Sequence, residues 1–280
     1  MTSFRRPSAL RDPRNALLVR QQNDHISASS IYENEFVFLE CLASLLIFVS
    51  ISKNLIPHQP NNMSATQTVQ ILSISTALLA SGGIAALSLF DIPIVQSQPA
   101  SRSLPMIRWL FSRGSHTFPT AAIISASGFV YLAYSSLPSS SLNSISSLLQ
   151  HAAMGKPGLY LAAAALSFSI APITGLAMIP TNFALIRKNE ELGGSRSAAS
   201  AEYREKAGSK ERSADESVDS KDDVSQWKDL SVPQEKTERK SSKAEDQEVN
   251  ELLDKFGKLN MLRAVAIGSG GIVGLMAALV

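Results

Sequence analysis

Long apolar stretches separated by polar segments dominate the pattern of hydrophobic and polar positions along the chain. Only one acid and one base occur within these stretches. A bilayer core about 30 Å thick requires about 20 apolar residues of α-helix. The pattern therefore predicts an all-α protein, a transmembrane four-helix bundle preceded by an additional N-terminal hydrophobic helix. The expected N-terminal helix covers residues 36–52, and the four spans cover about 68–90, 119–137, 158–186 and 262–280.

A soluble bundle of buried helices is the alternative interpretation of these stretches. Helices in soluble bundles carry a polar face, and these stretches mostly lack one, which favours the membrane. Small residues recur one turn apart at Gly82 and Ala86, and again at Gly270 and Gly274. Such pairs allow helix backbones to approach closely in lipid, so we expect tight helix contacts at both places.

The polar segments divide the chain into an N-terminal extension (1–62), a membrane domain (63–188 and 251–280) and a charged insert (189–250). The insert holds 16 of the 24 acids and 11 of the 26 bases, with few apolar residues. This composition is typical of disorder, and we predict a disordered loop. Two roles for it stay open, a solvated spacer and a docking segment for a protein partner.

The distribution of basic residues predicts the orientation in the membrane. Arg102 to Arg113 and the segment 187–258 would lie on one side, whereas the opposite loop, 138–157, carries only Lys156. Because basic loops stay in the cytosol, we expect an integral membrane protein of the endoplasmic reticulum or another endomembrane, with the charged loop cytosolic.

Residues that bind metals or cofactors are scarce. The chain has one cysteine and four histidines, and none has a partner at metal-ligand spacing. Gly-rich phosphate loops and dinucleotide fingerprints are missing from the sequence. Basic residues are not interleaved with aromatic ones, which argues against a nucleic-acid partner. We therefore expect no metal and no cofactor.

Five short strings together resemble the fungal anthrone-oxygenase-like family of small four-helix integral-membrane proteins. The strings are SGGIAALSLFDIP (81–93), RWLFSRGSHTFP (108–119), FVYLAYSS (129–136), LYLAAAALSFSIAPITGLAMIPTN (159–182) and LLDKFGKLNMLRA (252–264). The resemblance implies an anthrone-type monooxygenase. Such an enzyme would oxidise a polycyclic aromatic polyketide of secondary metabolism, with dioxygen as co-substrate and no cofactor. A hydrophobic aromatic small molecule and the lipid bilayer would be its partners.

The reaction that the resemblance implies needs a base and groups that stabilise an oxyanion. His116 is the candidate base, with a surface histidine as its alternative. Asn182 and Asn260 could donate to a ligand oxygen, or could instead cap helices. Arg263 lies just inside the last span, where a charge is costly unless it reaches the interface or is paired.

Three further residues are candidates for binding the substrate. Trp109 could stack on a flat ligand, or could anchor the helix at the membrane interface. Thr174 lies in the proline-containing span, and Asp91 could pair with Arg263 or Arg113. Charge placement brings all of these groups near the cytosolic ends of the helices. A non-enzymatic membrane scaffold, with the charged loop as a regulatory partner-binding segment, is the alternative function.

Two prolines, Pro172 and Pro180, interrupt the third span of the bundle. Each removes a hydrogen bond to the carbonyl four residues before it, and lipid cannot replace that bond. We therefore expect a kinked helix whose prolines face the interior of the bundle. The hydroxyls of Ser169 and Thr174, or groups of a neighbouring helix, would donate to the freed carbonyls.

Overall fold

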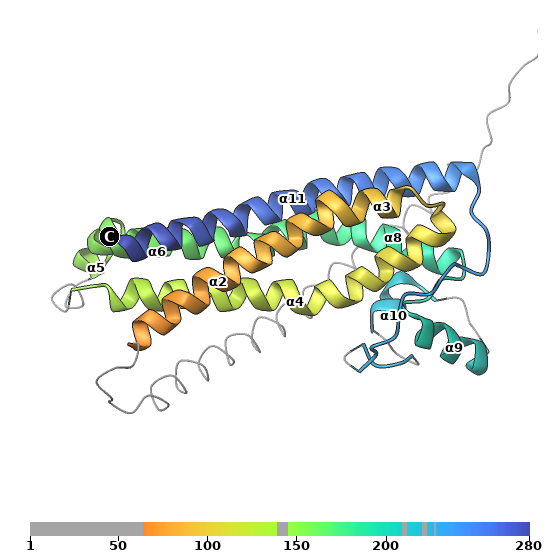
Figure 1. The fold of residues 1–280 in the computed structure, drawn as a ribbon, viewed down its shortest axis with the longest axis horizontal. Helices are drawn as coiled ribbons and strands as arrows, with labels where there is room; N and C mark the ends of the chain where they lie inside the picture. The colour runs from red at the N-terminus through yellow and green to blue at the C-terminus, as the bar shows by residue number, and fades with distance from the viewer. Residues whose placement is uncertain (1–63, 139–144, 209–211, 220–222, 227) are drawn as a thin grey trace, which may run out of the picture. The chain divides into compact units, whose positions relative to one another are not determined.

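The computed structural model describes residues 64–138, 145–208, 212–219, 223–226 and 228–280. The predicted N-terminal helix at 36–52 and the whole N-terminal extension (1–62) lie outside the described residues. Within the described ranges the chain is helical and contains no β-strand. The predicted all-α bundle is confirmed, and Figure 1 shows its long helices running side by side.

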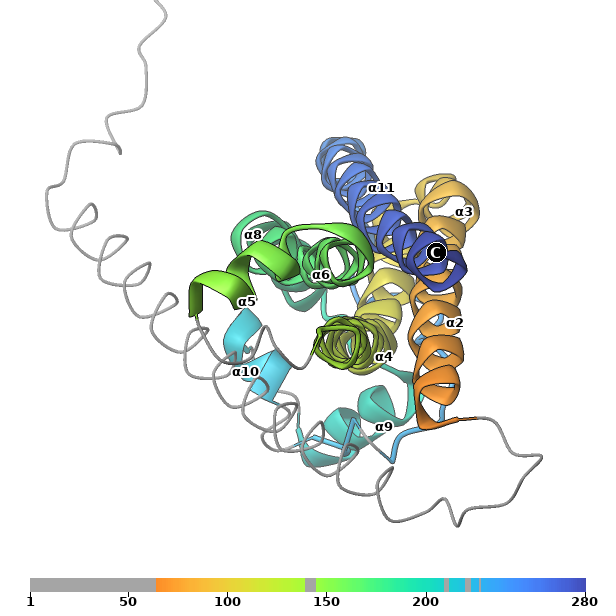
Figure 2. The same cartoon turned by 90° about the vertical axis from the view of Figure 1, so that its left-hand side faces the viewer.

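Four helical rods form the bundle, and each is long and apolar enough to cross a membrane. Around the bundle the first rod contacts the second and the fourth, and the third rod also contacts the second and the fourth (Figure 2). A short helix, α5 (Ile145–Ala152), precedes the third rod. The rods consist of α2 (Ala65–Ala86), η1 (Leu87–Asp91) and α3 (Ile92–Gln96); α4 (Ala100–Ser135); α6 (Gly155–Phe168), α7 (Ile170–Ile173), η3 (Thr174–Met178) and α8 (Ile179–Glu191); and α11 (Lys243–Leu279).

The rods extend beyond the predicted apolar spans at one end of the bundle. Helix α4 begins at Ala100, so the basic segment from Arg102 to Arg113, which we predicted to be a loop, is helical. Helix α11 begins at Lys243, where Ser242 and Glu245 form a capping box. These charged helix segments are stable because they pack against one another and against the insert, which hydropathy alone does not reveal.

Helix contacts depend on glycine at several points in α11. A Cβ atom on Gly270 would lie 2.9 Å from the carbonyl oxygen of Ala163 in α6. One on Gly274 would lie 2.3 Å from the ring of Phe129 in α4. The predicted close approach at Gly270 and Gly274 is therefore confirmed. The prediction for Gly82 is wrong, because this residue is exposed and no atom lies within 4 Å of its added Cβ.

Two π-helical turns, η1 and η3, accommodate prolines within the rods. Each is followed at once by an Ile-Pro pair, Ile92-Pro93 in the first rod and Ile179-Pro180 in the third. A π turn closes hydrogen bonds five residues apart and contains one extra residue. Thus the backbone N–H of Ile179 donates to the carbonyl of Thr174, and the proline that follows lies beyond a widened turn.

The expectation that the prolines of the third rod face inward is wrong. Pro172 and Pro180 are both exposed on the outer surface of the bundle. The hydroxyl groups of Ser169 and Thr174 donate to the carbonyls of Leu166 and Ile170 instead of those freed by the prolines. The inward face of this rod is formed by other residues, which line the cavity described below.

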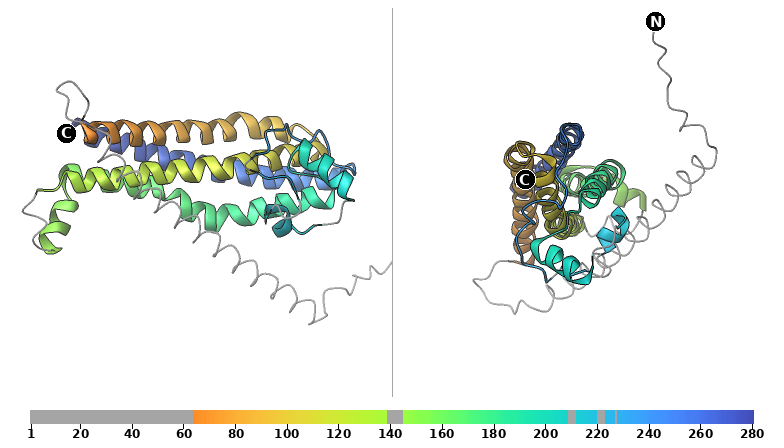
Figure 3. Two further views of the ribbon diagram at one scale, coloured as in Figure 1. Left: turned by 90° about the horizontal axis from the view of Figure 1, so that it is seen from below. Right: turned by 90° about the vertical axis from the view of Figure 1, so that its right-hand side faces the viewer.

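The charged insert differs from the disordered loop that we predicted. Helix α8 ends in a Schellman turn, in which Gly193 has φ +72° and the N–H of Gly194 donates to the carbonyl of Asn189 over 2.7 Å. Helices α9 (Ala198–Ala207) and α10 (Ala214–Asp219) follow. We call the described part of residues 192–242 the cap. It lies at one end of the bundle (Figure 3).

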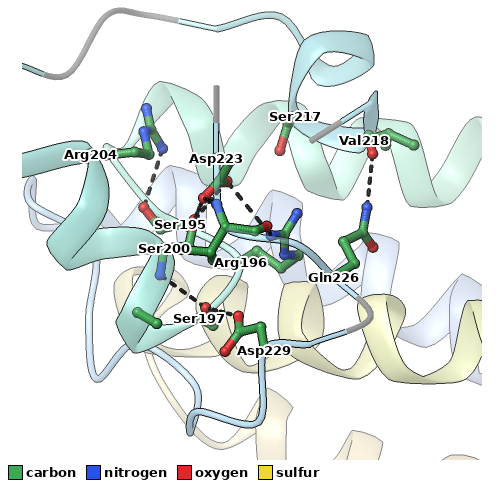
Figure 4. A network of polar contacts seen from close by, with 12 residues as sticks. Ser195, Arg196, Ser197, Ser200, Arg204, Ser217, Val218, Asp223, Gln226 and Asp229 are labelled. Atoms are coloured by element: carbon green, nitrogen blue, oxygen red, sulfur yellow. Dashed lines mark hydrogen bonds and ion pairs between the residues drawn. The ribbon is translucent and has the colours of Figure 1, made fainter. Parts of the chain in front are cut away.

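Polar contacts take the place of an apolar core in the cap. Ser200 donates to both carboxylate oxygens of Asp223 at 2.7 Å, and Ser197 donates to Asp229. Arg212 joins Asp223 to Glu190 of α8, with nitrogen–oxygen distances of 3.1 Å. Figure 4 shows the part of this network that lies within the cap. Low apolar content suggested disorder because it excludes an apolar core, but here helices α4 and α8 provide the surface on which the polar network forms.

Candidate functional site

A cavity of about 260 Å³ lies where the rods pass from their charged half to their uncharged half. It lies at the junction of two apolar clusters, one on each side along the bundle. Its walls come from α4, the π turns, α8, α11 and the cap. The lining residues are Leu87, Arg108, Leu110, Phe111, Ser112, Gly114, Ser115, Phe118, Pro119, Thr174, Met178, Ile179, Asn182, Phe183, Ile186, Val218, Gln226, Phe256, Asn260 and Arg263.

Aromatic and aliphatic side chains form most of the cavity wall. Four phenylalanines contribute to it, and two of them, Phe111 and Phe256, have ring centroids 5.0 Å apart. Pockets of this kind, apolar with a few placed polar groups, are typical of sites for small organic ligands. A flat hydrophobic molecule would therefore gain burial against these rings.

Arg263 is the principal polar group on the α11 side. Its side chain donates to the amide oxygen of Asn260 over 2.9 Å and contacts the sulfur of Met178 at 3.3 Å. Only 7% of the residue is exposed. Within the described part of the chain, no carboxylate forms an ion pair with it. A guanidinium group held in this way can stabilise negative charge on a ligand.

Two amides beside Arg263 have unused hydrogen-bonding capacity. The Asn260 amide nitrogen is buried and has no partner among the described residues, and the same holds for the Asn182 side-chain oxygen. Buried polar groups are nearly always hydrogen-bonded. A ligand that accepts from Asn260 and donates a hydroxyl to Asn182 would satisfy both groups.

Arg108 is a second buried cation on the cavity wall, on the side of the cap. It donates to the carbonyl oxygen of Ser217 in α10 over 2.9 Å, and only 3% of the residue is exposed. Val218 and Gln226 of the cap also line the cavity. The cap is therefore part of the wall, and Arg108 connects it to the bundle.

Four of the seven predicted site residues line this cavity. Asn182, Asn260, Arg263 and Thr174 come together there, as the placement of charges indicated. The roles assigned to them stay predictions. The threonine hydroxyl is already bonded to the carbonyl of Ile170.

The other three predicted residues, His116, Trp109 and Asp91, do not line the cavity. His116 is half-buried on α4. Trp109 donates through its indole nitrogen to Ser231 of the cap over 2.9 Å, and Arg113 lies 5.1 Å from its ring centre. Asp91 is exposed and forms no ion pair with Arg263 or Arg113 in the described structure.

The prediction of a loop between Arg102 and the span that begins at residue 119 concealed part of the site. In a helix, residues at intervals of three or four share a face, and Arg108, Phe111, Ser112 and Ser115 follow that spacing. All four line the cavity. The helical spacing was thus available in the sequence, whereas the contribution of Val218 and Gln226 depends on how the cap folds.

A protein family described as anthrone oxygenase matches residues 108–273, which include the described cap and all but one of the residues on the cavity wall. Neither the curated proteins nor the solved structures contain a significant match to the chain.

Proposed function

This chain belongs to the anthrone oxygenase family, and from that premise we propose that it oxidises an anthrone-type polycyclic aromatic polyketide with dioxygen. The observation that carries the proposal is the cavity, which combines phenylalanine walls with a buried guanidinium group and two amides. An anthrone has a flat three-ring body, a ketone oxygen and an acidic methylene group. The flat body matches the phenylalanine walls, and the ketone oxygen matches the polar groups.

In the proposed reaction the anthrone first loses a methylene proton to give an enolate. The electron-rich ring carbon then reacts with dioxygen, and loss of water gives the quinone, so that one anthrone and one dioxygen yield one quinone and one water. Negative charge develops on the former ketone oxygen. Arg263 and the Asn260 amide would stabilise that oxygen, and donors held in place before the reaction are most effective in a site from which water is excluded.

No carboxylate or imidazole group lines the described cavity wall. We therefore assign the protein an electrostatic role, in which stabilisation of the enolate allows the proton to leave to water. His116, the base that the sequence suggested, remains a candidate that mutation can test. Replacing it with alanine should leave most of the activity if this electrostatic description is right.

The test is oxygen consumption and quinone formation by purified protein in detergent, supplied with emodin anthrone. Wild-type protein should accelerate oxidation above the spontaneous rate. Arg263→Gln should lower kcat by about 100-fold, the scale seen when one oxyanion donor is removed, while the exposed Arg187→Gln should match wild type. Failure of the wild-type protein to exceed spontaneous oxidation would refute the proposed function.

We further propose that the cap faces the cytosol from an endomembrane. The four apolar rods support insertion into a bilayer. Lys and Arg are numerous in and around the cap, whereas the opposite loop, 138–157, carries only Lys156, and this difference supports the orientation. A protease added outside intact microsomes should cleave within the cap. Protection until the vesicles are opened would contradict the orientation.

A further inference from the structure

Two buried arginines line the same cavity without an acidic partner. Arg108 and Arg263 are 3% and 7% exposed. In the described part of the chain neither forms an ion pair, and no acidic residue lines the cavity. Each also has a buried Nε atom without a hydrogen-bond partner among the described residues. Glu190 and Asp223 act on Arg108 electrostatically, but both are ion-paired with Arg212. No acidic residue on the described cavity wall therefore neutralises either arginine.

Such an arrangement is unfavourable in the empty protein. Arginine keeps its charge in proteins, and a buried charge without a counter-ion loses its hydration without an equivalent return. A second like charge beside the same apolar space adds repulsion. Proteins rarely bury Lys or Arg fully without pairing them. An anionic ligand would supply the missing counter-charge to both groups.

The two guanidinium groups are held in different surroundings. Arg263 is bonded to Asn260 of its own helix, and the amide of Asn260 is the one that we assign to the reacting oxygen. Arg108 is bonded to the carbonyl of Ser217, beside Val218 and Gln226 of the cap. Of the two arginines, we assign the enolate oxygen to Arg263 alone, because Arg263 is bonded to the Asn260 amide of α11, whereas Arg108 is bonded to the cap.

We propose that the cavity selects anthrones that carry a ring carboxylate in addition to the reacting ketone. Arg263 takes the oxygen that becomes negative during the reaction, and Arg108 takes the carboxylate. This assignment rests on the proposed function for the reacting end of the ligand. A carboxylate suits Arg108 because guanidinium and carboxylate groups form short, charge-assisted hydrogen bonds.

The cap has a specific part in this selection. The hydrogen bond from Arg108 to Ser217 fixes the guanidinium group where the cap closes the cavity, so that Arg108 is both an anchor for the cap and the binding group for the carboxylate. The residue that recognises the carboxylate is thus positioned by a segment outside the four rods.

Binding of two matched probes tests the proposal without turnover. Anthraquinone-2-carboxylate and anthraquinone-2-carboxamide have nearly the same shape, and both are already oxidised. Their dissociation constants would be measured by titration of the purified full-length protein in detergent at pH 7. Wild-type protein should bind the carboxylate at least tenfold more tightly. Equal affinity for the two probes would overturn the proposal, and this result requires no variant.

Two substitutions on α4 then identify the residue that confers the preference. Arg108→Gln should reduce the preference to less than threefold. Arg102→Gln should keep the preference, because Arg102 is exposed and forms an ion pair with Glu235 of the cap at 3.6 Å. If Arg108→Gln retains the full preference, Arg108 is not the recognition residue. Arg108→Lys, which keeps the charge, should restore part of the preference and controls for loss of the fold.

The outcome separates this inference from the proposed function. Preferential carboxylate binding by a protein that oxidises no anthrone would uphold the charged subsite and refute the oxygenase. Oxidation of neutral anthrones together with equal binding of the two probes would do the reverse. Arg263→Gln gives a further separation, since it should lower kcat for oxidation by about 100-fold while retaining the carboxylate preference.

Discussion

Gly270 of α11 lies against the backbone of α6, and its replacement by alanine is a direct test of the bundle. The added Cβ would lie 2.5 Å from the Ser167 hydroxyl oxygen, 2.9 Å from the Ala163 carbonyl oxygen and 3.1 Å from the Ser167 backbone nitrogen. A rotamer change can move the hydroxyl, but the other two atoms are backbone. The substitution therefore forces the two helices apart.

The expected magnitude follows from two opposing effects. Overpacking of this kind costs about 1–3 kcal/mol. Replacing glycine by alanine inside a helix gains about 0.5–1 kcal/mol. Gly82 in α2 supplies the matched control, since it is exposed and its added Cβ meets no atom within 4 Å. Gly82→Ala should therefore be stabilised by about 0.5–1 kcal/mol, and Gly270→Ala should be about 1–3 kcal/mol less stable than that control.

Reversible unfolding in mixed micelles, followed by circular dichroism as the fraction of denaturing detergent rises, measures the difference. The comparison between the two variants removes the helix-propensity gain that both share. If Gly270→Ala is as stable as Gly82→Ala, the close contact between α11 and α6 does not exist, and the arrangement of rods described above is wrong at this point.

Three other variants address the cap and the helix ends. Burial alone would raise the pKa of Asp223, but hydrogen bonds from Ser200 and Arg212 and the charge of Arg196 outweigh it, so that its pKa lies below the ordinary value of 3.8. A lowered folded-state pKa means that this stabilisation is present above about pH 4 and is lost as the pH falls through the folded-state pKa. Hydrogen-exchange protection factors in the cap should fall with it, and Asp223→Asn should remove that dependence. Trp109→Phe removes the hydrogen bond from the indole to Ser231 of the cap and should speed proteolysis of the cap; an unchanged rate of cleavage would contradict that contact. Ser64→Ala removes the capping box of α2 and should lower the free energy of unfolding by about 1 kcal/mol in the same assay. An unchanged free energy would contradict the capping box at Ser64.

Hydropathy was sufficient to predict the rods because their uncharged halves lack polar faces. It could not set their full length. Arg102 to Arg113 reads as a polar loop, yet it is helical because its polar groups contact the cap, as in the hydrogen bond from Trp109 to Ser231. The cap itself depends on contacts between residues far apart in the sequence, such as Arg212 with Glu190. Amino-acid composition does not indicate which residues form such pairs.

The site was predicted best where charge is rare. Arg263, at the start of an otherwise uncharged span, was a candidate because a membrane tolerates few such residues, and it lies on the cavity wall with Asn182 and Asn260. Trp109 and Asp91 were chosen for their chemical type. Whether their side chains point into the cavity depends on how each helix is rotated about its axis, which the sequence did not indicate. Arg108 was missed because its segment was taken for a loop, although the same reasoning about buried charge applies to it.

The π turn η3 contains one extra residue and is followed by Pro180, so that a deletion in this turn would affect the proline. Leu176, within that turn, is 83% exposed, so its side chain contributes little packing. Deleting it would convert the turn to an α-helix and keep Asn182 at the same angle toward the cavity, since a π turn is one added residue. The ring of Pro180 would then meet the carbonyl four residues before it. In related chains we therefore expect the residue and the proline to be gained or lost together.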